Sequence, residues 1–328
     1  MRAYVVDVAN GPFVTVERPR PQPAKGEVLV RVRASGVNPL DAKIRAGAAA
    51  HARHPFPAVV GLDMAGVVEG TGAGVDGFRT GDEVYGLVGG VGGIQGTLAD
   101  YVSVPAALLA RKPASLSMRE AAALPLITIT AWEGIVDRAG VHPGQSVLVH
   151  GGAGGVGHIA VQLAKARGAT VFATVSTGKR GIVETFGATP IDYNELRPEE
   201  YVARYTGGAG FDVIYDTVGG STIDASFTAV KYWTGHVVSC LGWTTHALAP
   251  LSFRGATYSG VFTLLPLLTG QGQARHGEIL AEAATLADAG RLAPLMNDQH
   301  FSPNDLEAAH AAVVSGAAGK VVVEMSVE

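Results

Sequence analysis

A glycine-rich turn near the middle of the chain constrains its fold more than any other sequence feature. Residues 146–150 (SVLVH) form the short apolar run of a buried strand, and the motif GAGGVG follows at 152–157. Residues 156–167 then have the apolar spacing of a helix, which Gly168 ends. This order predicts a dinucleotide-binding turn, because glycines let the backbone approach a pyrophosphate at a helix N-terminus. The predicted contacts are Gly152, Gly154, Gly155, Val156 and Gly157; the alternative is a glycine-rich hairpin without a ligand.

Strands and helices continue to alternate after this turn. Short apolar runs predict strands, and amphipathic stretches between them predict helices. Buried strands that alternate with helices are typical of a doubly wound parallel α/β sheet. The expected strands are 146–150, 170–175, 190–191, 211–215, 235–240 and 256–262, and the expected helices are 156–167, one ending near 187, 195–206 and 223–230.

The two ends of the chain have a different pattern. The first hundred residues read as short strands, such as 28–32, 64–69 and 83–87, separated by glycine and proline turns. They predict a compact β-rich lobe. The tail is expected to return to this lobe, which makes the lobe discontinuous in sequence. In the tail we expect helices at 277–289 and 304–314, and strands near 299–301 and at 320–327.

Composition and charge exclude several classes of protein. With 328 residues, 47% hydrophobic and 16% charged, the chain can form two domains and is too polar for a membrane bundle. The net charge is −4 and the cations are scattered, so nucleic acid is not an expected partner. The single cysteine, Cys240, excludes an intramolecular disulfide and a cysteine-based structural zinc site. Together with the absence of a signal-peptide pattern, this predicts a cytoplasmic protein.

The end of the strand 170–175 bears on the choice of cofactor. An NAD-binding unit usually places an Asp or Glu there to bind the ribose 2′-hydroxyl. Residues 174–180 (TVSTGKR) contain no acid, and hydroxyls with two cations suit a 2′-phosphate. We therefore expect NADPH, bound by Thr174, Ser176, Lys179 and Arg180. The alternative is that Lys179 and Arg180 only begin a solvated helix.

Four segments together resemble one known family. They are 147–165 around the glycine turn, GVNPLD at 36–41, PAVVGLDMAG at 57–66 and AAALP at 121–125. They resemble the medium-chain dehydrogenase/reductase superfamily, and more narrowly its zinc-free quinone oxidoreductase (zeta-crystallin-like) branch. The resemblance covers essentially the whole chain. It implies a GroES-like catalytic domain from 1–126 and 263–328, a Rossmann domain at 127–262, an active site in a cleft, and a homodimer joined through the edge of the Rossmann sheet.

The resemblance also bears on zinc. Zinc alcohol dehydrogenases of this superfamily have a cysteine where this chain has Asn38 and a histidine where it has Leu62. The region of their four-cysteine lobe, around 88–96, is short here and contains no cysteine. His51 and His54 precede prolines that disfavour a helix, and we interpret them as loop residues. We expect no catalytic zinc.

Further site residues are implied by the resemblance alone. Asn38 corresponds to an active-site asparagine near the nicotinamide, and Thr130 to a threonine of the nicotinamide pocket. Tyr193 and Thr217 correspond to residues on the adenosine side. Lys43 stands where many quinone reductases have a tyrosine, so the resemblance does not decide how the substrate carbonyl is held. Contacts at the nicotinamide end are expected from Leu241, Gly242, Val261 and Phe262, of which Leu241 and Phe262 are equally compatible with core packing.

These residues point to hydride transfer without a metal. Hydride addition to an enone or quinone places negative charge on the carbonyl oxygen, which hydrogen-bond donors or a solvent proton must stabilise. Asn38 is the best-placed donor and Lys43 a second, and with Thr130 they form the predicted catalytic set. The expected function is an NADPH-dependent reductase of quinones or α,β-unsaturated carbonyls. The alternative is an NADPH-binding sensor or structural protein with little turnover.

Overall fold

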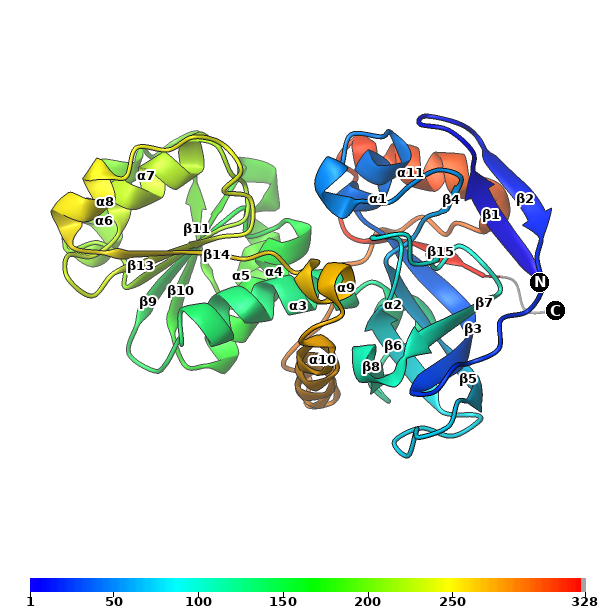
Figure 1. The fold of residues 1–328 in the computed structure, drawn as a ribbon. Coiled ribbons are helices and arrows are strands. Elements are labelled where there is room, and N and C mark those ends of the chain that lie inside the picture. Colours follow the sequence, from blue (N-terminus) through cyan, green and yellow to red (C-terminus); the bar gives the residue numbers. More distant parts are fainter. Residues whose placement is uncertain (326–328) are drawn as a thin grey trace. The chain divides into compact units, whose positions relative to one another are not determined.

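Two compact units make up the structure, a computed structural model that describes residues 1–325 (Figure 1). One unit combines Met1–Leu126 with the chain from Leu264 onward, and the other is Ile127–Thr263. No helix among the described residues is long and apolar enough to cross a membrane.

The unit Ile127–Thr263 is built on a parallel sheet of six strands. Its spatial order is β11-β10-β9-β12-β13-β14, and every neighbouring pair is parallel. The predicted doubly wound sheet is therefore confirmed. The strands are β9 (Ser146–His150), β10 (Thr170–Val175), β11 (Thr189–Asp192), β12 (Val213–Asp216), β13 (His236–Ser239) and β14 (Thr257–Gly260).

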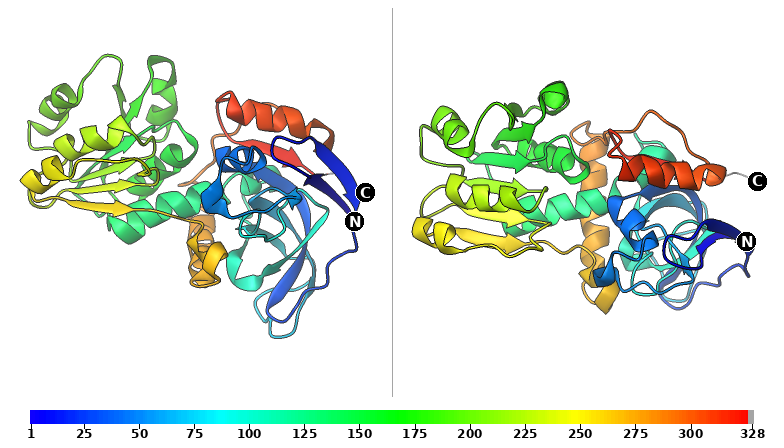
Figure 2. Two further views of the ribbon diagram at one scale, coloured as in Figure 1. Left: turned by 45° about the horizontal axis from the view of Figure 1, so that its top comes forward. Right: turned by 90° about the horizontal axis from the view of Figure 1, so that it is seen from above.

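Helices lie on both faces of this sheet (Figure 2). Aromatic and branched side chains of the strands and helices form a buried cluster that includes Leu148, Phe172, Phe211, Ile214 and Phe227. Burial of such side chains removes apolar surface from water, which is the main stabilising contribution. The helices are α3 (Pro125–Trp132), the π-helix η3 (Glu133–Arg138), α4 (Gly155–Ala166), the 3₁₀ turn η4 (Thr177–Lys179), α5 (Arg180–Thr185), α6 (Pro198–Thr206), α7 (Ser221–Ala229) and α8 (Ala249–Arg254).

The other unit contains two antiparallel sheets. The long strand β3 pairs with β5 and β7 from the N-terminal half and with β15 from the end of the chain, where Val321 lies opposite Val37. The predicted β-rich lobe is therefore present. Its strands are β1 (Arg2–Val6), β2 (Phe13–Glu17), β3 (Glu27–Val37), β4 (Ala58–Val59), β5 (Asp63–Thr71), β6 (Glu83–Leu87), β7 (Tyr101–Pro105), β8 (Leu109–Arg111) and β15 (Val321–Glu324).

Helices of this unit come from both ends of the chain. The C-terminal α11 packs against the N-terminal α1 and against β15. The helical segments are α1 (Pro39–Arg45), η1 (Ala50–Ala52), η2 (Ala106–Leu108), α2 (Met118–Ala122), α9 (Leu265–Thr269), α10 (Gln273–Asp288), η5 (Pro303–Asp305) and α11 (Leu306–Val314).

Two expectations for the tail differ from the structure. The strand expected near 299–301 is only an isolated bridge between Phe301 and Val323, and Pro303, two residues later, cannot extend the pairing. The strand expected at 320–327 is the shorter β15. The last part of that expectation, 326–328, lies outside the described residues.

Candidate functional site

The glycine turn joins the end of β9 to the start of α4. A Cβ on Gly157 would lie 2.1 Å from the carbonyl oxygen of Gly151, and one on Gly152 would lie 2.5 Å from the Cβ of Ala173. Only glycine fits these two positions without a shift of backbone or strand. Gly154 is the N-cap of α4, whose first N–H groups have no partner within the helix. The turn can therefore hold a pyrophosphate, with Gly155 and Val156 in the first turn of α4.

Two threonines bind the backbone of this turn. The Thr174 hydroxyl accepts a hydrogen bond from the Gly151 N–H at 3.1 Å and lies 3.1 Å from Nδ1 of His150. The Thr217 hydroxyl donates to the carbonyl oxygen of His150 at 2.6 Å. Thr174 is buried and Thr217 half-buried. Both residues, predicted as cofactor contacts, thus hold the turn in its shape.

His150 and Asp216 lie opposite each other at the ends of β9 and β12. Both are buried, and burial lowers the pKa of His150 while the charge of Asp216 opposes this effect. One oxygen of Asp216 accepts the N–H groups of Val218 and Gly219, at 3.0 and 2.6 Å. Asp216 thus stabilises the loop that follows β12.

The adenosine-side predictions follow β10 and β11. Ser176 is half-buried, and Lys179 and Tyr193 are exposed. Arg180 forms ion pairs with Glu195 and with Asp192, the latter at 3.4 Å. Asp192 also accepts a 2.5 Å hydrogen bond from the Thr177 hydroxyl, which is the first cause of its lowered pKa.

The nicotinamide-side predictions follow β13 and β14. Leu241 and Phe262 are 37% and 38% exposed, and Val261 is buried. The ring of Phe262 lies 6.5 Å from that of Trp243. A Cβ on Gly242 would lie 2.2 Å from the Tyr258 hydroxyl, so the tyrosine side chain would have to move to admit one. All of these residues lie at the carboxyl ends of the parallel strands, the edge where open α/β sheets bind ligands.

Thr130 belongs to the same unit, in α3. Its hydroxyl lies 2.9 Å from the Thr263 hydroxyl, and its carbonyl oxygen accepts a 2.7 Å hydrogen bond from Tyr215. Thr130 is 7% exposed and therefore buried.

Asn38 lies in the antiparallel unit, in a buried polar cluster with Asp41, Asp63 and Lys320. Its Nδ2 donates to Asp63 at 2.9 Å, and its Oδ1 accepts a hydrogen bond from the Lys320 ammonium. The backbone N–H of Asn38 donates to Asp41 at 2.8 Å, and that of Leu126 donates to Asp63 at 2.9 Å. An ammonium can only donate and a carboxylate can only accept, so the Asn38 amide satisfies both neighbours in one orientation only.

Burial dominates the electrostatics of this cluster. It raises the pKa of Asp41 to about 7 and that of Asp63 to about 6, and Lys320 lowers both. Burial also lowers the pKa of Lys320, against the attraction of the two carboxyls. One oxygen of Asp41 has no hydrogen-bond partner in the described part of the chain. Two acids therefore share a single buried cation.

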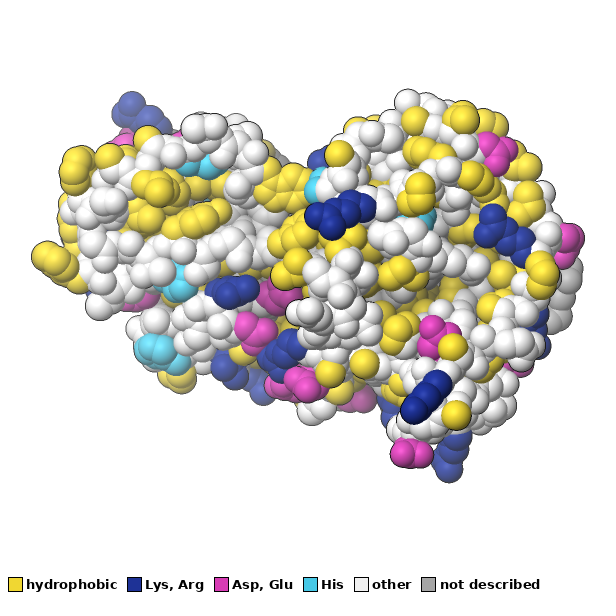
Figure 3. Space-filling view, in the orientation of Figure 1, with side chains coloured by type: hydrophobic (Ala, Val, Ile, Leu, Met, Phe, Trp, Pro, Cys, Tyr) yellow, Lys and Arg dark blue, Asp and Glu magenta, His cyan; other side chains and the backbone are white. Residues whose placement is uncertain are grey.

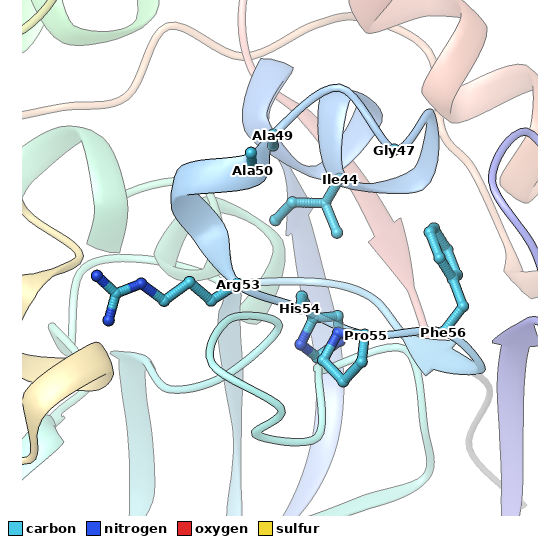
Figure 4. Close-up of a pocket in the computed structure, with 8 residues that line it drawn as sticks. All are labelled: Ile44, Gly47, Ala49, Ala50, Arg53, His54, Pro55 and Phe56. Atoms are coloured by element: carbon cyan, nitrogen blue, oxygen red, sulfur yellow. The ribbon is translucent and has the colours of Figure 1, made fainter.

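Lys43 lies on α1 beyond this cluster and is exposed. A cavity of about 380 Å³ lies beside α1 (Figure 4). In that view Ile44 points toward His54 and Pro55, while Arg53 and Phe56 extend at opposite ends. His54 approaches the carbonyl oxygen of Val59 at 3.3 Å, as expected of a loop histidine. The cavity is lined by Ile44, Gly47, Ala49, Ala50, Arg53, His54, Pro55 and Phe56.

Known proteins share both parts of this architecture. Residues 24–114 match the family model "Alcohol dehydrogenase GroES-like domain", and residues 155–268 match "Zinc-binding dehydrogenase". The 2-methylene-furan-3-one reductase of Solanum lycopersicum is 36% identical over 312 residues, which cover 92% of this chain and 73% of that protein. This chain belongs to the medium-chain dehydrogenase/reductase superfamily.

Two further members of the superfamily are similar over most of their length. The chloroplastic NADPH-dependent alkenal/one oxidoreductase of Arabidopsis thaliana is 35% identical over 312 residues, covering 92% of this chain and 73% of that one. The crystal structure of an alcohol dehydrogenase superfamily protein from Novosphingobium aromaticivorans is 56% identical, with a TM-score of 0.97 and coverage of 99% and 100%. The chain is therefore an oxidoreductase of this superfamily, and its Rossmann unit is of the kind that binds a nicotinamide cofactor.

The superfamily includes zinc enzymes, so we tested the buried cluster as a zinc site. Asn38 already bonds to Asp63 and Lys320, and Leu62 offers no ligand atom. The Lys320 ammonium supplies the positive charge beside the two carboxyls. Across residues 1–325, no group of three or more His, Cys, Asp or Glu side chains is arranged to hold a metal. The residues present do not fit zinc.

Several residues of this superfamily member escaped the sequence analysis. Lys320 is 282 positions from Asn38, and no local pattern connects the two. Asp192 ends β11 and Glu195 follows it, whereas the NAD-binding pattern concerns an acid at the end of β10. The dipeptide Asp192–Tyr193 was a usable signal, because adjacent parallel strands end at the same edge.

Proposed function

We propose that this chain is a zinc-independent reductase that transfers a hydride from NADPH to an α,β-unsaturated carbonyl compound or a quinone. The main support is that β10 ends without an acid, while Lys179, four residues after the end of the strand, is exposed and forms no ion pair with another described residue. A carboxylate there would repel a 2′-phosphate, and an ammonium attracts one. The names of the tomato and Arabidopsis relatives support the substrate class.

The residues of this chain would bind and orient the reactants. When bound, NADPH supplies the hydride, and the protein supplies position and polarity. The glycine turn and the first N–H groups of α4 suit the pyrophosphate, and Lys179 suits the 2′-phosphate. The substrate oxygen gains negative charge during transfer and needs a donor. We propose the second N–H of the Asn38 amide for this role, since the first donates to Asp63 and the amide oxygen accepts from Lys320. Lys43 and Thr130 stay predictions.

Steady-state oxidation of NADPH tests the proposal. We expect the protein to turn over at least one substrate of a panel of benzylideneacetone, trans-2-nonenal and 1,4-benzoquinone. Elemental analysis of the same preparation should find no stoichiometric zinc, and chelators should not reduce its activity. Turnover that requires about one zinc per chain would contradict the zinc-free reading. NADPH binding without turnover on any substrate would favour the sensor or structural alternative.

Cofactor choice is tested separately by fluorescence titration. NADPH should bind at least about tenfold more tightly than NADH. Lys179→Glu should remove most of this preference, and Lys25→Glu, an equal charge change at an exposed site in the other unit, should not. Equal affinities of the unchanged protein for the two cofactors would refute the NADPH assignment.

The homodimer stays a prediction. β14 lies at the end of the sheet and pairs with β13 alone among the described strands, so its outer edge has unpaired backbone groups. Figure 3 shows hydrophobic side chains exposed on this unit, and Trp233 and Phe253 are 84% and 83% exposed. Both features are compatible with a second copy.

A further inference from the structure

The segment that follows β10 is held by two acids, Asp192 at the end of β11 and Glu195 shortly after it. Asp192 accepts hydrogen bonds from the Thr177 hydroxyl at 2.5 Å and from the Asn194 N–H at 2.9 Å, and its side chain is fully buried. Glu195 forms its ion pair with Arg180 from a position that is 58% exposed. Several donors thus hold the buried Asp192 carboxylate in place, whereas the ion pair of Glu195 is exposed to solvent.

These contacts change the charge that a 2′-phosphate would meet. Lys179 and Arg180 provide two positive charges, and Asp192 and Glu195 provide two negative ones, so the four side chains together are neutral. The Arg180 guanidinium is always charged, and the hydrogen bond to Glu195 raises its pKa further. A phosphate that carries nearly two negative charges must share the Arg180 guanidinium with Glu195, which holds its Nη2.

We infer that Glu195 is a specificity-determining residue that weakens the preference for a 2′-phosphate by competing for Arg180. The inference rests on the cofactor site of the proposed function. It also divides the two predicted cations: Lys179 forms no ion pair with another described residue, whereas Nη2 of Arg180 is held by both Glu195 and Asp192. Because Glu195 is exposed, its ion pair is weak enough for a bound phosphate to replace it.

Two fragments isolate this effect, since 2′,5′-ADP and 5′-AMP differ only by the 2′-phosphate. In isothermal titration, Glu195→Gln should tighten 2′,5′-ADP about threefold or more and leave 5′-AMP unchanged. Glu199→Gln removes the same charge from an exposed position nearby that forms no ion pair with any described residue, and it should change neither affinity. The same comparison with NADP⁺ and NAD⁺ on the whole protein should agree.

The Arg180→Ala variant completes the test. Combined with Glu195→Gln it should abolish the gain in 2′,5′-ADP affinity, because the gain depends on the released guanidinium. The inference is overturned if Glu195→Gln does not tighten 2′,5′-ADP binding or tightens both fragments equally. It is also overturned if the gain in 2′,5′-ADP affinity persists without Arg180. If NAD⁺ binds more tightly than NADP⁺ but Glu195→Gln still tightens 2′,5′-ADP through Arg180, only the NADPH assignment fails. If neither fragment binds, both proposals fail.

Discussion

Replacing Lys320 by methionine tests how the buried cluster of the antiparallel unit is stabilised. The side chain is 5% exposed and donates to Asn38 between two buried carboxyls. Methionine retains similar length and apolar volume, so the substitution mainly removes the ammonium. The Asn38 oxygen then lacks a donor, and Asp41 and Asp63 lose their shared cation. Removal of one partner from a buried ion pair costs about 3–5 kcal/mol while the remaining charge is present.

The cost should depend strongly on pH. A carboxyl whose pKa is raised in the folded state binds a proton more tightly there than when unfolded, so its contribution to stability falls as pH rises from about 4 to its folded pKa. The pKa values of about 7 for Asp41 and about 6 for Asp63 place this window between about pH 4 and pH 7. Without Lys320 both pKa values rise further, and each additional unit costs about 1.4 kcal/mol at high pH.

We therefore expect Lys320→Met to cost about 3 kcal/mol or more at pH 8.5 and clearly less at pH 5, where both acids are protonated and the lost donor to Asn38 is the main cost that stays. Urea unfolding followed by far-UV circular dichroism at both pH values measures this difference. Tryptophan fluorescence gives an internal comparison, because Trp132, Trp233 and Trp243 all lie in the parallel-sheet unit.

Lys112→Met is the matched control. The Lys112 side chain is 6% exposed and pairs at 3.2 Å with Glu83, which is 54% exposed. Since the acid is solvated, the cost of this substitution should be similar at pH 5 and pH 8.5. If Lys320→Met is equally destabilising at both pH values, or is worse at pH 5, the assignment of a shared buried cation is wrong.

Two further substitutions test the site. Asn38→Ala should lower kcat by up to about a hundredfold with little change in NADPH affinity. It should also lower the melting temperature, because Lys320 and Asp63 lose their partner. An unchanged kcat measured well below the melting temperature would remove Asn38 from the catalytic set. Gly157→Ala should weaken binding of both NADPH and NADH in titrations, because its Cβ would lie 2.1 Å from the Gly151 oxygen. Gly178→Ala is the control and should leave binding nearly unchanged, because a Cβ there meets open space. Normal binding by Gly157→Ala would contradict the turn geometry.

Local patterns were sufficient for the parallel sheet and for its glycine turn. Strands such as Ser146–His150 and Thr170–Val175 were predicted with the bounds they have, because each is a continuous apolar run bounded by turn residues. The glycine turn was likewise predictable, because the glycines that its close backbone approaches require are all within the GAGGVG motif. Elements without a strong local period, such as the bridge at Phe301, were not predictable in this way.

The sequence by itself determined which residue types are available: glycines at the turn, cations after β10, and no cysteine or histidine at the positions of the zinc ligands. The tertiary structure alone decided their partners. Lys320 reaches Asn38 because β15 pairs with β3, and Arg180 meets Asp192 and Glu195 because β10 and β11 end side by side. Hydrophobic periodicity is a property of neighbouring residues, whereas ion pairs depend on distances in space that strand pairing sets.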